Sequence, residues 1–296
     1  MTTTRLLSTL LLALALSACG ASSAPAEPAV ATTTPTGGGE NSAPVELRVR
    51  ATPGARYETH THARTESTDG LVLTDARGSM QIDGVDTQTD VTRVTTRVHS
   101  IELRDAAGRP VQAAGTEALD LSGATFHRAI DSRAATVGPV TVEGTNAQNA
   151  AMAESMRSMF EQSTIRLPER PVRVGESWRD TVQMRVPVQG AIMPFACTTD
   201  SRLARLDGSA AEQLAVIEFV SDCASEPVHI AGPAGELTFS IATHVTGESH
   251  VALADGLAGR ITMDSDTRTT MRIGDQPEAV IPARQHIEIT TTPIIQ

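Results

Sequence analysis

Hydrophobic and polar residues alternate along much of this chain, most clearly between residues 261 and 273. The odd-numbered positions there hold Ile, Met, Ser, Thr, Thr, Met and Ile, and the charged residues fall on even-numbered positions: Asp264, Asp266, Arg268 and Arg272. A period of two is typical of a β-strand with one buried face and one face in water. The same alternation recurs at residues 45–49, 182–188 and 239–245. The chain is therefore expected to be mainly β, with antiparallel strands.

Turn signals separate these segments. Asp-Gly pairs lie between strand-like runs at residues 69–70, 83–84, 207–208 and 255–256, and Asp followed by Gly favours the tight turn of a β-hairpin. A strand of the length of residues 261–273 would extend for about 43 Å, more than most strands of a small sandwich. The expected fold is a long curved antiparallel sheet or an incomplete barrel.

One segment has helical rather than strand periodicity. Its large apolar residues follow the i, i+4, i+7, i+8 spacing of an amphipathic helix: Met152, Met156, Met159 and Phe160. Thr145 and Gln148 have the spacing of a capping box, so we expect a helix over about 146–165, packed on the sheet. The four side chains have two interpretations. They either fill the core, or face an apolar ligand, to which flexible Met side chains adapt well.

The first twenty residues have the organisation of an export signal. Arg5 precedes an apolar stretch over residues 6–16, and small residues lead to Cys19, as in a secretory signal peptide. The sequence Leu-Ser-Ala-Cys at residues 16–19 resembles the bacterial lipobox. This resemblance implies that residues 1–18 are removed and that Cys19 is acylated, and two or three acyl chains anchor a protein durably. The apolar stretch, about 11 residues, is too short to span a bilayer.

Amino-acid composition separates a linker from a folded domain in the rest of the chain and argues against several functions. Residues 20–44 are rich in Ala, Ser, Pro, Thr and Gly, so residues 19–44 are expected to be a lipidated Cys with a disordered linker, followed by one β-rich domain over 45–296. A net charge of −11 argues against nucleic-acid binding. An aromatic content of 2% argues against sugar-binding surfaces, which use aromatic stacking. No cofactor is expected.

After Cys19, two cysteines remain in the chain, Cys197 and Cys223. An even pair in an oxidising compartment is expected to form a disulfide. Their spacing is not that of a CxxC redox or metal motif.

The most distinctive string in the chain is LPERPVRVGESW, at residues 167–178. Pro168 and Pro171 would end the helix and stiffen the entry to a strand, Gly175 would allow a turn or bulge, and Trp178 would plug one end of the core. The string resembles a Leu-Pro-x-x-Pro-Val-x-Val-Gly-x-x-Trp signature found in a domain-of-unknown-function family of exported bacterial lipoproteins. The resemblance implies a fold similar to the open half-barrels of lipoprotein carriers and no established activity.

Candidates for chemistry are few. His60 and His62 share one face of an expected strand and are weak candidates for metal ligands, because no third ligand is visible nearby in the sequence. Asp264 and Asp266 form a same-face carboxylate pair, which Arg268 and Arg272 are expected to neutralise. The chain contains none of the sequence motifs G-x-S-x-G, H-E-x-x-H, G-x-x-x-x-G-K-[ST] or G-x-G-x-x-G, so we do not expect an enzyme.

The sequence therefore predicts an exported lipoprotein, held by its lipid anchor in the outer membrane and facing the periplasm. Gly20 occupies the position after Cys19, where Asp commonly retains such proteins at the inner membrane. The expected function is binding of an apolar ligand, such as a lipid, or of a partner protein of the envelope, without catalysis. A purely structural envelope component is the alternative, and a metal-dependent hydrolase is a distant one.

The lipobox gives a direct prediction. Replacing Cys19 with Ser should prevent acylation and release the protein from the membrane fraction, because the thiol that carries the lipid is lost. Metabolic labelling with a clickable fatty acid measures the result. Label that persists on the Cys19→Ser protein would contradict lipidation at this residue.

Overall fold

The computed structural model describes residues 43–111, 121–146, 149–162, 166–188, 191–209, 212–232 and 235–294. These residues form mainly β structure, as the alternation predicts. The elements run along the chain in the following order: β1 (Arg56–Ser67), β2 (Gly70–Asp86), β3 (Val91–Asp105), β4 (Thr125–Ile130), β5 (Thr141–Glu143), α2 (Ala150–Gln162), β6 (Ser177–Val188), β7 (Ala191–Asp207), β8 (Leu214–Ser225), β9 (Val228–Gly232), β10 (Gly235–Ala252), β11 (Ala258–Ile273) and β12 (Ala279–Pro293).

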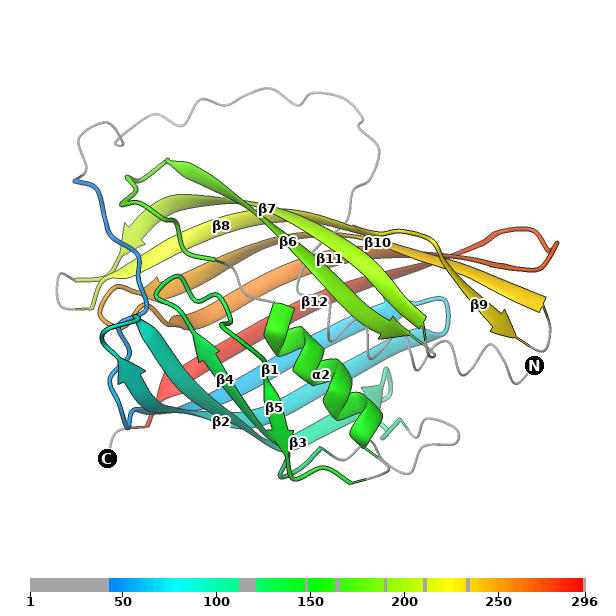
Figure 1. Cartoon of the computed structure of the whole chain (residues 1–296), viewed down its shortest axis with the longest axis horizontal. Coiled ribbons are helices and arrows are strands. Elements are labelled where there is room, and N and C mark those ends of the chain that lie inside the picture. The colour runs from blue at the N-terminus through cyan, green and yellow to red at the C-terminus, as the bar shows by residue number, and fades with distance from the viewer. Residues whose placement is uncertain are drawn as a thin grey trace.

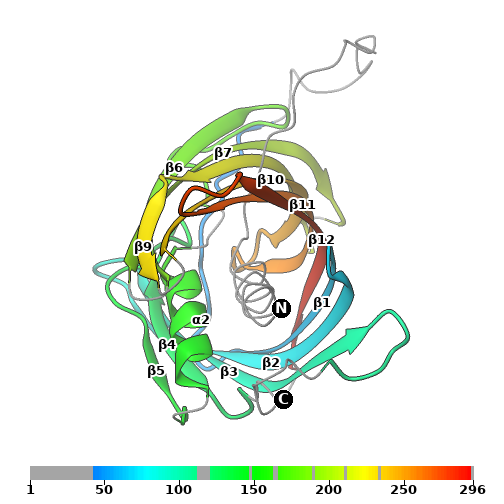
Figure 2. The same cartoon turned by 90° about the vertical axis from the view of Figure 1, so that its right-hand side faces the viewer.

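All strands of the described chain belong to one antiparallel sheet. Its order is β5-β4-β3-β2-β1-β12-β11-β10-β8-β7-β6, with β9 paired to β10 beside this path. The two end strands, β5 and β6, do not pair with each other, so the sheet is not closed into a barrel. Viewed end-on, it curls around a concave face, and α2 lies across the opening between the two ends (Figure 2). The helix contacts β4, β5 and β6. The expected curved antiparallel sheet is therefore confirmed.

Long strands make this curvature necessary. β10 has 18 residues and β2 has 17, and they run most of the length of the molecule (Figure 1). A twisted sheet of such strands must curl to bury one face. Gly247, in the middle of β10, allows close packing, because a Cβ atom there would collide with the Phe219 ring of β8.

One end of the concave face is filled by chain that precedes the first strand. Leu47, Val49 and Ala51 are buried, and they pack in one cluster with residues of β1, β2, β3, β4, β7, β8 and β10. Backbone bonding fixes this segment: Val45 pairs with Val172, and the Val49 N–H donates to the Ser132 carbonyl at 2.8 Å. The segment from residue 45 onward is thus an integral part of the core.

The helix is shorter than expected. It spans Ala150–Gln162 instead of about 146–165, and its cap differs from the expected one. The Asn146 side chain accepts from the Asn149 N–H at 3.0 Å, and the Asn149 side chain accepts from the Asn146 N–H at 2.8 Å. This reciprocal pair makes the capping box, so the assignment to Thr145 was wrong; Gln148 lies outside the described residues. Within the described ranges, no helix has the length and hydrophobicity needed to span a bilayer.

The expected disulfide is confirmed. Cys197 of β7 and Cys223 of β8 are bonded and lie directly opposite each other in the antiparallel pair. Cys223 belongs to a buried apolar cluster on the concave face of the sheet, and Cys197 packs against this cluster.

Removal of this bond should destabilise the fold. Replacing Cys197 and Cys223 together with Ser should lower the free energy of unfolding by about 3.5 kcal/mol, because the unfolded chain regains the entropy of an open loop of this length. Urea unfolding followed by circular dichroism measures the change, and wild type under reductant is the control. A loss below about 1 kcal/mol would show that the closed loop restrains the unfolded chain little.

Candidate functional site: the concave face and helix α2

The two faces of the sheet differ sharply in chemistry. The concave face carries an apolar cluster contributed by strands on both sides of β10. Its buried members are Ala63, Met193, Phe195, Phe219, Cys223, Val228, Phe239, Ile241, Val245, Met263 and Ile287. Other apolar side chains pack against this cluster but remain partly exposed: Ile230, Leu237, Ile261 and Ile289. The concave face therefore offers apolar surface that remains partly exposed among the described residues.

Helix α2 adds a second apolar surface. Met156 and Phe160 are partly buried against a cluster that includes Phe126 and Ala153, and the Phe126 and Phe160 rings lie 5.0 Å apart, tilted. The side chains of Met152 and Met159 lie outside the described residues. On the other side of the helix, Arg157 pairs with Glu154 and Glu161. The helix thus presents its apolar side to the sheet.

Arg128 brings a positive charge to this apolar surface. It stands in β4 between the buried residues Phe126 and Ile130, so its side chain projects from the same face as theirs. Its guanidinium carbon lies 5.2 Å from the centroid of the Phe160 ring. Burial alone lowers the pKa of Arg128 to about 10, which leaves the group charged at neutral pH.

The Arg128 charge has no described anion beside it. Its Nε atom is buried and has no hydrogen-bond partner among the described residues. By contrast, Gln285 on the concave face is satisfied, because its Nε2 donates to Thr65 Oγ1 at 3.0 Å. Thr243 and Thr269 also bury a hydroxyl oxygen without a partner, but an uncharged hydroxyl costs less to bury than a cation. Arg128 is therefore the costliest of these groups and the one that an anion would best neutralise.

Arg128 is not among the residues predicted from the sequence. The signal was present, since a single Arg stands at the middle position of a Phe-x-Arg-x-Ile alternation over residues 126–130. A charged residue in the apolar register of a strand is expected to face the core. The segment is short, and its burial depends on α2, which follows later in the chain.

The convex face carries charged pairs that join neighbouring strands and, for Arg205 and Glu248, the two strands on either side of β8. Arg179 pairs with Asp200, Arg202 with Glu218, Arg260 with Glu288, and Arg205 with Glu248. Such pairs between opposite strands are typical of a sheet face in contact with water. Asp264 and Asp266 lie on this face, but our assignment of their partners was wrong. They pair across the strands with His286 and Arg284, because side chains directly opposite in a sheet are closer than those two or more positions apart on one strand.

His60 and His62 also lie on the convex face. The structure brings a third ligand type to them, Asp75 of β2, which the sequence could not place. All three belong to the long β1–β2 hairpin.

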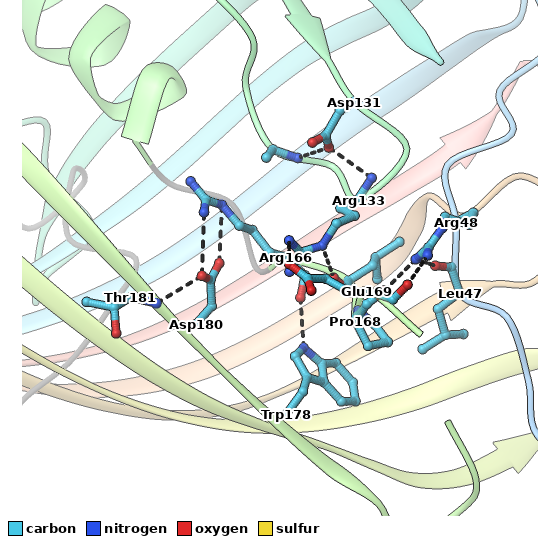
Figure 3. Close-up of polar contacts among 12 residues, drawn as sticks. Leu47, Arg48, Asp131, Arg133, Arg166, Pro168, Glu169, Trp178, Asp180 and Thr181 are labelled. Carbon is cyan, nitrogen blue, oxygen red and sulfur yellow. Dashed lines mark hydrogen bonds and ion pairs between the residues drawn. The ribbon is translucent and has the colours of Figure 1, made fainter. Parts of the chain in front are cut away.

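The signature string packs with the N-terminal segment at the filled end of the sheet, and Figure 3 shows its polar contacts. Pro168 is buried, and its carbonyl accepts from Arg48. Trp178 Nε1 donates to the Arg166 carbonyl at 2.9 Å, and Gly175 has a φ of +92°, a turn conformation that favours glycine. Pro171 is exposed. These contacts fasten the chain between α2 and β6 to the N-terminal segment. Cys19 lies outside the described residues.

Comparisons with known proteins add little. No protein-family model matches the chain, and no curated protein matches it. One solved structure is described as an outer membrane channel from Pseudomonas putida F1. Its alignment with this chain has 10% sequence identity and a TM-score of 0.15, and it includes 81% of this chain and 97% of the channel chain. A TM-score this low carries no argument about fold or function. The lipoprotein-family resemblance stays a prediction.

Arg128 gives a prediction about stability. Replacing Arg128 with Met should raise the free energy of unfolding by about 1 kcal/mol, because a partly buried cation whose Nε has no partner among the described residues is exchanged for an apolar side chain of similar length. Arg284→Met is the matched control, because it removes the same charge from an exposed ion pair with Asp266 and should change stability little. Urea unfolding of both variants measures the difference. A destabilised Arg128→Met protein would mean that Arg128 has partners that hold it in place.

Proposed function

We propose that this protein is a lipid-anchored module of the bacterial envelope that binds an apolar ligand with an anionic group on its concave face, without catalysis. The observation that carries the proposal is Arg128, whose Nε is buried without a hydrogen-bond partner among the described residues and whose guanidinium lies against the Phe160 ring. The apolar body of the ligand would lie along the concave surface, and its anionic group would lie at Arg128.

The apolar part of the proposal is supported by the partly exposed side chains of the concave face. Ile261 and Ile289 project toward the same side as the buried cluster of Met263, Ile287 and Phe239. Covering such side chains with an alkyl chain stabilises a complex by about 25 cal/mol for each Å² of apolar surface removed from water. The flexible Met156 side chain at α2 would adapt to ligands of different shape.

The proposed anionic group of the ligand is supported by the unfavourable environment of Arg128 in the unbound protein. The buried Nε of Arg128 loses hydration, and the Phe160 ring replaces this only in part. A carboxylate or phosphate would restore charge-assisted hydrogen bonds to Arg128, worth about 1.5–3 kcal/mol. A neutral ligand of the same length would not gain this energy.

The location is supported by the sequence. The signal at residues 1–18 and the lipobox Cys19 would place the domain at a membrane surface, and Gly20 after the Cys favours the outer membrane facing the periplasm. The charged convex face is suited to water, so the acyl chains of Cys19 would provide the membrane contact.

A pair of ligands that differ only in charge tests the proposal. The Cys19→Ser chain, collected from the periplasm, is titrated with oleate and with oleyl alcohol by displacement of a fluorescent fatty acid. Oleate should bind about tenfold or more tightly than the alcohol, since a charge-assisted hydrogen bond is worth at least that ratio. In Arg128→Met the two ligands should bind alike, whereas Arg284→Met should retain the preference for oleate.

Two outcomes would overturn the proposal. If neither ligand binds wild type, the concave face is a filled core and the protein is a structural component of the envelope. If oleate binds equally to wild type and Arg128→Met, the ligand does not use Arg128. Native mass spectrometry of protein from its own host adds a check: anionic lipid should co-purify with wild type and less with Arg128→Met.

A further inference from the structure

We propose that His60, His62 and Asp75 form a binding site for a divalent transition-metal ion, such as Zn²⁺, on the convex face of the β1–β2 hairpin. This site is on the opposite face of the sheet from Arg128, and it does not depend on the proposed ligand function.

The backbone register places the three residues together. His60 and His62 are two positions apart on β1, so they share one face. Asp75 of β2 is directly opposite His62 in the antiparallel pair and diagonal to His60. The site therefore lies within a single hairpin, in which all of β1 is paired with residues 70–81 of β2.

The ligand atoms converge. His60 Nε2 lies 3.1 Å from Asp75 Oδ1, and His62 Nδ1 lies 3.0 Å from Asp75 Oδ2. The two imidazole ring centroids are 4.0 Å apart, and one ligand atom from each residue can be chosen so that all three lie within 4.8 Å of one another. In tetrahedral Zn²⁺ coordination, bonds of about 2.0–2.1 Å separate neighbouring ligand atoms by roughly 3.3 Å. The side chains are thus close to the spacing that the metal requires.

The donor set indicates which metal. Two imidazole nitrogens and one carboxylate are suited to Zn²⁺, Cu²⁺, Ni²⁺ or Co²⁺, whereas Ca²⁺ and Mg²⁺ prefer sets of oxygen ligands. His60, His62 and Asp75 keep 33%, 57% and 32% of their side-chain surface exposed, so an ion can enter directly from water and retain water as a further ligand.

The convex face supplies its own controls. His244 pairs with Asp222 at 3.1 Å and His286 pairs with Asp264 at 2.8 Å, both across neighbouring strands. These pairs have the same chemistry as His62 and Asp75, but each joins a single His to a carboxylate. A metal that needs two imidazoles should therefore distinguish the β1–β2 site from them.

The test is calorimetric titration of Zn²⁺ into the whole chain, produced without a histidine tag. Wild type should bind one Zn²⁺ at its tightest site. His60→Gln, His62→Gln and Asp75→Asn should each weaken this binding about tenfold or more, since each removes one ligand, and His244→Gln should change it less than about twofold. Circular dichroism of every variant checks that it is folded, and two of the three site variants suffice if one fails to fold.

A fourth variant should strengthen binding. Arg77 Nε lies 3.7 Å from Asp75 Oδ1 and competes with a cation for this carboxylate. Arg77→Gln should raise the Zn²⁺ affinity about two- to fivefold at low salt, as expected for one exposed unit charge at this distance. Co²⁺ should give the visible absorption of a low-symmetry site in wild type and lose it in His62→Gln.

Three results would each overturn the proposal. One is the absence of saturable Zn²⁺ binding to wild type. The second is an equal loss of affinity in His62→Gln and His244→Gln, which would indicate nonspecific binding to surface His–Asp pairs. The third is displacement of Zn²⁺ by equimolar Ca²⁺ or Mg²⁺, which would indicate a site made of oxygen ligands.

Discussion

The alternation of side chains along each strand is the constraint on which the rest of this structure depends. Successive residues point to opposite faces, so one curved sheet acquires an apolar concave face and a charged convex face. A slip of one residue in any strand pairing would place charges such as Asp264 against the concave cluster and expose Met263 to water. The long strands multiply this penalty, because every residue of a slipped strand would change faces.

Because the sheet is not closed into a barrel, other segments of the chain must cover part of its apolar concave face. The N-terminal segment fills one end through Leu47 and Val49, and α2 covers the opening between β5 and β6 (Figure 2). The signature string ties these covers together, because Arg48 donates to the Pro168 carbonyl and Arg133 donates to the Leu167 carbonyl at 2.8 Å. Pro168 and Trp178 thus take part in the contacts that hold these covers at the end of the open sheet.

The sequence predicted what depends on local pattern. Strand periodicity, the curved sheet and the cysteine pair follow from residues close together in the chain or from simple redox chemistry. The features it missed depend on pairing at a distance. The position of Asp75 opposite His62 requires the hairpin register, and the burial of Arg128 requires Phe160 from a later helix. The capping error had a local cause: Asn146 and Asn149 compete with Thr145 for the same role, and their side chains bond each other's backbone.

The two faces of the sheet keep their charged groups under different physical conditions. On the convex face, water screens each charge, so His–Asp and Arg–Asp pairs cost little and add little to stability, and they can exchange partners with a metal ion. On the concave face, a charge is expensive without a partner. A residue that lowers the free energy of unfolding of the free protein can still be useful if it stabilises a complex. This is the argument for a ligand at Arg128. This stability argument does not apply to His60 and His62, because both are exposed to water and cost little in the free protein. Only the measured metal affinity can test their site.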